Sequence, residues 1–377
     1  PQYLVLLVGS IVFNFLISQP ISRFAEKGNV AGARRLMLFA VAANLLTLAY
    51  FKYANFFIDT VNTLSGSPLP ALDVVLPIGI SFFTFTQIAF LVDCYEGKVN
   101  EPDFLYYLLF VTYFPHLIAG PVLHHAEMMP QFSSRDTYRW QPRNISIGLI
   151  FFSIGLFKKV VLAGGIQPYV GPVFDHGTPP DLITAWGAAL AYTLQLYFDF
   201  SGYSDMAIGL SKLFNVDLPI NFNSPYRSKN ISEFWRRWHM TLSRFLRDYL
   251  YVRMGGNRHG QFRRYANLMA TMLLGGLWHG AGWTFVVWGG LHGLFLVINH
   301  GWQKLFPAKP GEPASLHGRL LAQIVTFGAV VVAWVFFRAH TFDDAVRVIA
   351  GMAGANGWTT GDGSAIDTRQ WLWIAFS

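Results

Sequence analysis

The sequence predicts an all-α, polytopic integral membrane protein in which transmembrane, re-entrant and interfacial helices surround an internal chamber. Only 13% of the 377 residues are charged and 53% are hydrophobic, whereas a soluble domain has about 25% charged residues. Long stretches contain no charged residue and lack the alternation of apolar and polar residues that a membrane β-strand requires. The basic residues gather in one segment. These observations exclude an ordinary cytosolic enzyme.

The charge-free stretches mark the expected membrane helices, because about 20 mainly apolar residues cross a bilayer core. They run from Pro1 to Ser22, Leu36 to Phe51, Val74 to Val92, Phe104 to Ala126, Leu182 to Phe198, Tyr265 to Gln303 and Leu320 to Phe337. Within the fourth stretch, Pro115 and Pro121 each remove a backbone donor, which predicts a broken helix. Irregular backbone is tolerated at membrane depth only beside protein or a water-filled cavity, hence the expected chamber.

We expect residues 1–377 to form a single multi-spanning domain. The first apolar stretch lacks the basic start of a cleavable signal and is predicted to remain as a helix. The chain begins at Pro1 and ends inside an apolar run, residues 370–376, which predicts that both termini were trimmed. Cys94 is the single cysteine, so no internal disulfide forms.

The charge distribution predicts the orientation in the membrane. Residues 212–264 contain eleven Lys or Arg and three Asp or Glu, a net charge of +8 in a chain of net charge +7. Excess Lys and Arg mark the cytoplasmic side, so we place this segment there. Residues 164–181 contain no Lys or Arg and fit the outer side. The aromatic residues of 212–264 follow a helical, membrane-facing spacing, and we therefore expect no nucleic-acid binding.

His279 lies inside the longest charge-free stretch. As one helix, Tyr265 to Gln303 would be about 58 Å long, roughly twice the hydrocarbon thickness, so it must turn or break. The expected breakpoints are glycines 275, 276, 280, 282, 289 and 290. An ionisable group at this depth is costly and suggests function. The alternative is a neutral histidine hydrogen-bonded between helices, which is the favoured interpretation for His292 and His300.

His239 lies in a segment that predicts an amphipathic interfacial helix. Residues 230–233 (NISE) are typical of a helix N-terminus, with Asn230 or Ser232 as the cap. From Phe234 to Tyr251 the apolar residues share one helical face, which includes His239, and the arginines share the other. The arginines by themselves fit lipid anchors. The alternative for His239 is a helix-packing role.

Other polar residues interrupt the apolar stretch that begins at Leu182. Asp199 and Asp205 either line a cavity or pair with arginines of the following segment, and we favour pairing because buried carboxylates need partners. The sequence contains no phosphate-binding P-loop, no HExxH and no CxxC. Nucleotide hydrolysis and metalloprotease chemistry are thereby excluded from the leading functions, and no metal site is expected.

Several motifs together resemble the membrane-bound O-acyltransferase (MBOAT) family. They are FKYANF at 51–56, LPIGISF at 76–82, FPHLIAGP at 114–121, the run at 197–209, EFWRRWH at 233–239 and GGLWHGA at 275–281. More narrowly, the chain resembles the membrane subunit of bacterial alginate O-acetyltransferase and related exopolysaccharide acetylation proteins. The resemblance extends from about residue 45 to 340, and its most specific block is 233–281.

The resemblance implies acyl transfer inside a helical chamber, with His279 as the essential residue and His239 as a second polar residue. It implies an acetyl group taken from cytoplasmic acetyl-CoA, a donor substrate and not a bound cofactor. Arg236, Arg237 and Arg244 are the candidates to contact the phosphates of that donor. The acceptor would be an exopolysaccharide such as alginate or cellulose, reached through a periplasmic partner acetyltransferase, at the bacterial inner membrane.

Two other functions compete with this hypothesis. The first is a transporter or flippase whose intramembrane histidines relay protons. The second is a non-catalytic scaffold that recruits a secreted partner. Release of CoA that depends on His279 would support the enzyme, and solute uptake without CoA release would support the transporter.

Overall fold

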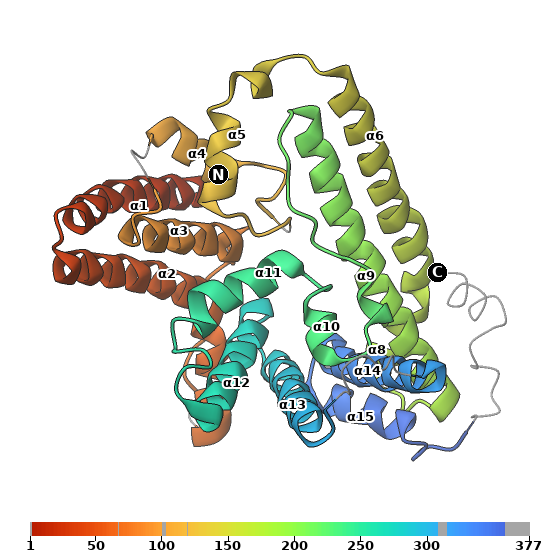
Figure 1. The fold of residues 1–377 in the computed structure, drawn as a ribbon. Coiled ribbons are helices and arrows are strands. Elements are labelled where there is room, and N and C mark those ends of the chain that lie inside the picture. Colours follow the sequence, from red (N-terminus) through yellow and green to blue (C-terminus); the bar gives the residue numbers. More distant parts are fainter. Residues whose placement is uncertain (1, 67, 100–102, 119, 308–314, 359–377) are drawn as a thin grey trace. The chain divides into compact units, whose positions relative to one another are not determined.

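A computed structural model describes residues 2–66, 68–99, 103–118, 120–307 and 315–358 (Figure 1). Within these ranges every regular element is helical, which confirms the predicted all-α class. Four helices are long and apolar enough to cross a membrane: Tyr3–Glu26, Val30–Ser65, Pro142–Tyr169 and Leu316–Arg338. The chain divides into two compact units, the first from Pro1–Phe152 with Met206–Pro219, the second from Ser153–Asp205 with Ile220–Ser377.

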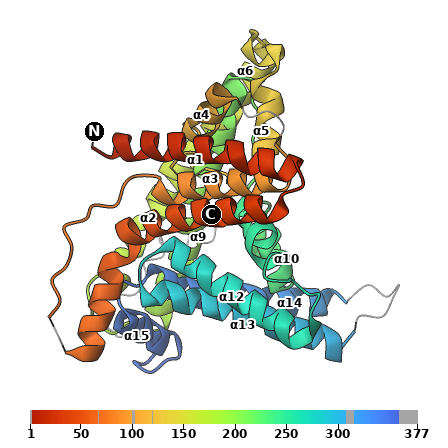
Figure 2. The ribbon, with the colours of Figure 1, turned by 90° about the vertical axis from the view of Figure 1, so that its left-hand side faces the viewer.

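Three helices that lie side by side form most of the first unit: α1 (Gln2–Glu26), α2 (Val30–Ser65) and α3 (Ile80–Tyr95) (Figures 1 and 2). The side chain of Asn29 caps α2 by accepting a hydrogen bond from the Gly32 amide. Two short helices follow, α4 (Phe104–Thr112) and α5 (His125–Phe132), and a 3₁₀ turn, Arg135–Tyr138. The first unit is thus a helical layer with short helices packed on it.

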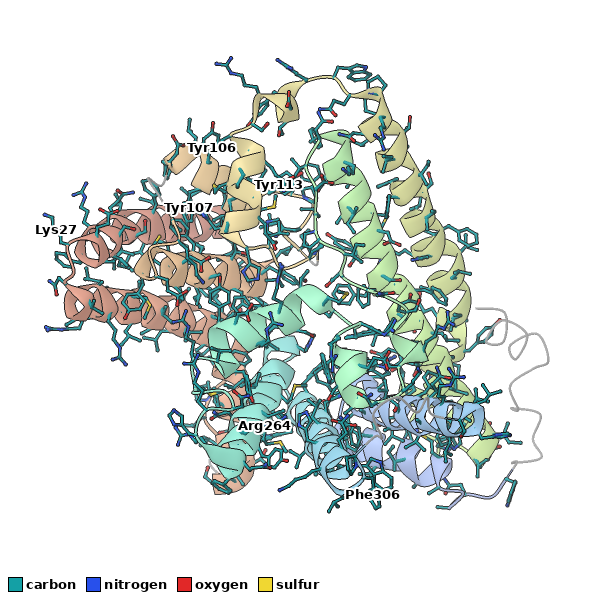
Figure 3. The ribbon with its side chains drawn as sticks, in the orientation of Figure 1. Lys27, Tyr106, Tyr107, Tyr113, Arg264 and Phe306 are labelled. Carbon is teal, nitrogen blue, oxygen red and sulfur yellow. The ribbon has the colours of Figure 1, made fainter. Side chains whose placement is uncertain are left out.

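A buried polar network joins the helices of this unit. The Asn14 and Asn44 amides exchange hydrogen bonds of 3.0 and 2.7 Å, which tie α1 to α2. Gln87 of α3 accepts from Asn14 at 2.9 Å and from the Tyr107 hydroxyl of α4 at 3.1 Å; Tyr107 is labelled in Figure 3. Gln87 in turn donates to Ser10 at 2.8 Å. These bonds satisfy amides that would otherwise be costly inside a membrane.

The backbone from Tyr113 to Ile118 and from Gly120 to His124 is not a regular helix, as the two prolines predict. It packs against the start of α3 at Gly79, whose φ of +75° lies in the left-handed region. A Cβ atom there would lie 2.8 Å from the Leu117 carbonyl oxygen. Only glycine fits this close approach, because a side chain would meet both the strained φ and the neighbouring backbone.

The helix that leads from the first unit into the second lies in none of the charge-free stretches from which membrane helices were predicted. α6 (Pro142–Phe157) continues through a π-helical turn, Lys158–Ala163, into the short helix α7 (Gly164–Ile166), a 3₁₀ turn, Gln167–Tyr169, and α8 (Gly171–Phe174). The long helix α9 (Leu182–Leu213) follows. The lysines at 158 and 159 interrupt an otherwise apolar helix, which is why the sequence alone hides this span.

Those lysines pair with the carboxylates of α9. Lys158 Nζ lies 2.6 Å from Asp205 Oδ2, and Lys159 pairs with Asp199. Pairing was predicted, but the partners are lysines of the preceding helix and not the predicted arginines of the following segment. Opposite charges placed at the same depth of two adjacent helices lower the cost of burying both.

The predicted continuous helix from Phe234 to Tyr251 is wrong. α10 (Ile231–Trp235) is capped by Asn230, which accepts from the Glu233 amide at 2.9 Å. The chain then turns at residues 236–239, and α11 (Met240–Phe245) with a π-helical turn, Leu246–Tyr251, follows. His239 lies in the turn and not on a helical face.

The longest charge-free stretch breaks as predicted, into α12 (Gly260–His279) and α13 (Trp283–Leu305), two helices that pack against each other. Gly280 and Gly282 have extended backbone at the break. Gly276 and Gly289 are not breakpoints: a Cβ atom on either would lie 2.3 Å from a backbone oxygen of the other helix. In Figure 3, Arg264 and Phe306 mark the end of this hairpin remote from His279.

Two helices complete the second unit, α14 (Leu316–Arg338) and α15 (Phe342–Met352). Thr341 caps α15, because its hydroxyl accepts from the Asp344 amide at 3.1 Å. The core of the unit is rich in aromatic residues, among them Trp288, Trp334 and Phe234, each about 1% exposed. The division into two compact units does not test the prediction that residues 1–377 form a single domain, which stays a prediction.

Candidate active site

His239 occupies a left-handed backbone conformation, with φ of +43° and ψ of 53°. Such a conformation is uncommon for a residue with a side chain and persists only where its surroundings impose it. Two backbone bonds do so: the Asn223 amide donates to the Arg237 carbonyl, and the Met240 amide donates to the Asn221 carbonyl, both at 2.9 Å. Segment 221–223 thereby fixes the backbone turn that contains His239.

The side chain of Asn221 fixes the protonation of the His239 ring. Its Oδ1 atom accepts from the Thr241 hydroxyl at 2.9 Å and from the Thr241 amide at 3.3 Å, and it lies 3.1 Å from His239 Nδ1. Its Nδ2 atom donates to Ser204 at 3.2 Å. Because the backbone amide is an obligatory donor, Oδ1 is an acceptor and His239 Nδ1 carries the proton. In the neutral ring Nε2 is then the acceptor.

The Nε2 atom of His239 is buried and has no hydrogen-bond partner among the residues that the structure describes. The whole residue is 1% exposed. Its ring lies edge-on to Phe200, with centroids 4.7 Å apart. A buried acceptor without a partner is costly and calls for an explanation.

His279 lies beside His239, with ring centroids 6.5 Å apart. It is the last residue of α12 and half-buried. Its ring is edge-on to Trp288 of α13 at 5.0 Å and to Phe337 of α14 at 5.3 Å. The structure therefore brings together the two histidines that the sequence singled out, although 40 positions separate them.

His292 is the third histidine of this cluster and was not expected there. It lies on α13 one helical turn beyond Trp288, with ring centroids 5.0 Å apart, and is fully buried. Neither ring nitrogen has a hydrogen-bond partner in the described part of the chain. The expected interhelical hydrogen bond of His292 is therefore absent there. Its ring is enclosed by aromatic side chains, including Phe234 and Trp235.

The three candidate arginines differ in their surroundings. Arg237 donates to Glu233 at 2.8 Å and to the Asn223 carbonyl at 3.2 Å, so it stabilises the turn before His239. Arg236 is exposed, and Arg244 is half-buried. Arg236 is thus the one of the three that is most accessible to a phosphate, whereas Arg237 already has a structural role.

Across the described ranges, no group of three or more His, Cys, Asp or Glu is arranged to hold a metal ion. The cluster presents imidazole rings with indole groups around them. A neutral imidazole with an available nitrogen suits proton transfer.

Comparisons with known proteins identify the family of this chain. The family model described as MBOAT, membrane-bound O-acyltransferase family, matches residues 33–338, which include both histidines. The peptidoglycan O-acetyltransferase of Helicobacter pylori is 44% identical over 94% of this chain and 71% of its own length. The probable alginate O-acetylase AlgI of Azotobacter vinelandii is 42% identical over 96% and 71%. A teichoic acid D-alanyltransferase of Bacillus subtilis is 27% identical over 72% and 71%.

The family match covers most of the chain, and the relatives named O-acetyltransferase or O-acetylase align over more than nine-tenths of it. The helices able to cross a membrane place the molecule in a bilayer. The paired histidines lie within the matched region. This chain belongs to the membrane-bound O-acyltransferase family and is a multi-pass membrane O-acyltransferase.

Proposed function

We propose that the protein takes an acetyl group from cytoplasmic acetyl-CoA and passes it to a hydroxyl group on the outer side of the bacterial inner membrane, for O-acetylation of an exopolysaccharide. The observation that carries the proposal is the His239–His279 pair, with rings 6.5 Å apart and a buried, unpartnered Nε2 on His239. A buried acceptor of this kind can hold a substrate hydroxyl beside a second imidazole that takes the proton. A transporter would need no acyl donor.

In the proposed step, His279 removes the proton of the acceptor hydroxyl while that oxygen attacks the thioester carbonyl carbon. The new C–O ester bond forms, the C–S bond breaks, and CoA leaves as a thiolate. The imidazolium of His279 then returns the proton to the thiolate, so that free CoA and the acetyl ester are the products. No covalent acyl-enzyme is required.

His239 is proposed to orient the acceptor and not to move the reacting proton. With its proton held on Nδ1 by Asn221, the Nε2 atom can accept a hydrogen bond from a neighbouring hydroxyl of the acceptor. A neutral ring in this tautomer cannot donate from Nε2, which makes His239 a poor stabiliser of the oxyanion. The buried indole N–H of Trp288, which has no acceptor among the placed residues, is our candidate for that role.

The donor side is proposed to be the basic segment 212–264, whose net charge attracts the phosphates of CoA. Arg236 is the exposed candidate for a phosphate contact, and Arg244 and Arg237 are the further candidates.

We prefer an acetyl group to a D-alanyl group as the group transferred, because relatives above 40% identity are named for acetyl transfer and those near 27% for D-alanyl transfer. A periplasmic partner acetyltransferase is proposed as the immediate acceptor that passes the group to the polymer.

The test is release of CoA by purified protein in detergent given radiolabelled acetyl-CoA and a hydroxyl acceptor. His279→Ala should lower the rate about 10²- to 10⁴-fold, the usual contribution of a general base. His300→Ala is the matched control, because His300 lies on the same hairpin outside the cluster and should leave the rate unchanged.

Near-normal CoA release by a folded His279→Ala variant would overturn the assignment. Uptake of a solute into vesicles without CoA release would instead favour a transporter. Thermal unfolding of both variants, measured beside wild type, separates lost chemistry from lost folding.

A further inference from the structure

A polar cavity lies away from the histidines, where α8, α9 and α14 meet. Its volume is about 330 Å³, and its lining includes Gln167, Tyr192, Gln195, Asp175 and Arg338. Sites for small ligands begin at about 300 Å³. Neither the sequence motifs nor the proposed acyl-transfer step uses these residues.

Tyr192 gives this cavity a buried polar group. Only 9% of the residue is exposed, yet it lines the cavity. None of the hydrogen bonds between described residues involves the side chain of Tyr192, Gln167 or Gln195. A buried phenol and two carboxamides that share one cavity without internal partners are expected to be satisfied by a ligand or by water.

The charges in this cavity cancel. Arg338 Nη2 lies 2.8 Å from both carboxylate oxygens of Asp175, and His340 lies 3.2 Å from the same carboxylate. The guanidinium also lies over the Phe174 ring, 5.5 Å from its centroid. The Arg338 charge is therefore already paired, and the groups left for a ligand are neutral donors and acceptors.

A polar strip continues from the cavity along α9. Tyr192, Gln195 and Asp199 are spaced three and four residues apart, which places them on one helical face over about 10 Å. Asp199 pairs with Lys159, and both side chains are more than a third exposed. Charged groups at membrane depth face the protein interior or a water-filled cavity, so this face of α9 is expected to contact water.

The cavity is expected to lie on the outer side of the membrane. The span Pro142–Tyr169 begins in a stretch that contains Arg135, Arg139 and Arg143, and it ends in residues 164–181, which contain no Lys or Arg. The positive-inside rule places such an end outside. Phe337, which contacts the His279 ring, directly precedes Arg338 of the cavity.

We propose that this cavity binds a saccharide unit of the polymer that finally receives the acetyl group, through the hydroxyl groups of the sugar, as a site separate from the histidine pair. Amide and phenol side chains both donate and accept, which matches neighbouring sugar hydroxyls, and the paired charge of Arg338 makes no demand for an anionic ligand. The inference rests on the proposed function, because it assumes that the final acceptor on the outer side is a carbohydrate.

The experiment measures binding and not turnover. Tetramers of mannuronate, N-acetylglucosamine and glucose are titrated against the protein in nanodiscs by saturation-transfer NMR. At least one tetramer should bind wild type, and Gln195→Ala, Gln167→Ala and Tyr192→Phe should each weaken it about fivefold to tenfold, the effect of one lost hydrogen bond. Gln303→Ala, an exposed glutamine near the end of α13, is the matched control.

Binding that is equal in wild type and in the three cavity variants would overturn the proposal, as would the absence of binding by all three tetramers. Gln167 lies in an exposed turn, so its variant is expected to fold even where a helical variant does not. His279→Ala should bind the tetramer normally. Loss of the proposed acyl transfer would therefore leave this result standing, and the two proposals fail separately.

Discussion

The amide network of the first unit and the histidine cluster of the second treat buried polar groups in opposite ways. In the amide network Asn14 and Gln87 are fully buried and their amides hydrogen-bond to Asn44, Ser10 and Tyr107. In the histidine cluster His239 and His292 are as deeply buried, but three of their four ring nitrogens have no partner in the described structure. The cost of burial is similar, and only the amide network offsets it with hydrogen bonds of its own.

This contrast separates a structural polar cluster from a functional one. A satisfied network between membrane helices holds them together and specifies their packing. A buried acceptor without a hydrogen-bond partner does not stabilise the fold, and it is retained where a substrate or water donates the missing hydrogen bond. The comparison predicts that changes in the histidine cluster reduce activity, and that changes in the amide network reduce stability.

Asn221 offers the sharpest test of this comparison, with the largest effect expected among the variants that compare the two clusters. Asn221→Leu removes the hydrogen-bond acceptor for His239 Nδ1, so the proton of the neutral ring is no longer held on Nδ1. Leaving a buried donor unpaired costs about 1–3 kcal/mol, so acyl transfer should fall roughly 5- to 150-fold. The measurement is the rate of CoA release, with thermal unfolding as the check on folding.

Asn221→Asp is the rescue variant, because a carboxylate still accepts from His239 and from Thr241, and the Ser204 hydroxyl can rotate to donate. It should recover most of the rate that the leucine variant loses. If both variants lost the same activity, Asn221 would act by shape and not by positioning His239.

Asn44 tests the other side of the comparison. Asn44→Leu leaves Asn14 without its partner on α2, and interhelical hydrogen bonds in membranes average about 0.6 kcal/mol with a maximum near 1.7. The free energy of unfolding in detergent should fall by about that amount, while the rate of CoA release per folded molecule stays constant. Thr47→Val, which loses only a bond to the Ala43 carbonyl of its own helix, is the control. A loss of activity without a loss of stability would break the distinction between the units.

The smallest effect is expected at Asp344, a satisfied carboxylate outside the predicted spans. Hydrogen bonds from the Thr341 hydroxyl and from Arg347 hold the pKa of Asp344 below its ordinary value of 3.8. Because the folded pKa is depressed, the stabilisation is present above pH 3.8 and is lost as the pH falls through the folded pKa. Asp344→Asn should lower stability by about 0.2–0.5 kcal/mol at pH 7, and the difference should vanish at low pH. A difference that persists at low pH would point to packing.

Much of the architecture could be predicted because membrane solvation dictates it. The all-α class, the irregular backbone around 114–121, the break of the longest charge-free stretch and the candidate histidines all follow from the cost of burying polar groups and backbone. The resemblance to the family pointed to His239 and His279, and the structure places their rings side by side.

Other features depend on tertiary contacts that no local pattern contains. The turn at His239 is imposed by segment 221–223, which overrides the helical periodicity of 234–251. Asn221 was missed because a lone asparagine carries no signal until its partners, Ser204 and Thr241, are known. The span from Pro142 was hidden by two lysines whose charges are paired by α9.

The contact between Gly276 and Gly289 has a consequence for movement. Backbone atoms of α12 and α13 lie so close there that a single added carbon would overlap the facing chain. Helices in such contact cannot slide or separate without losing the packing of both backbones. The hairpin that ends at His279 is therefore expected to move as one rigid body, and any gate that admits donor or acceptor is expected where the backbone is irregular, at the turn before His239.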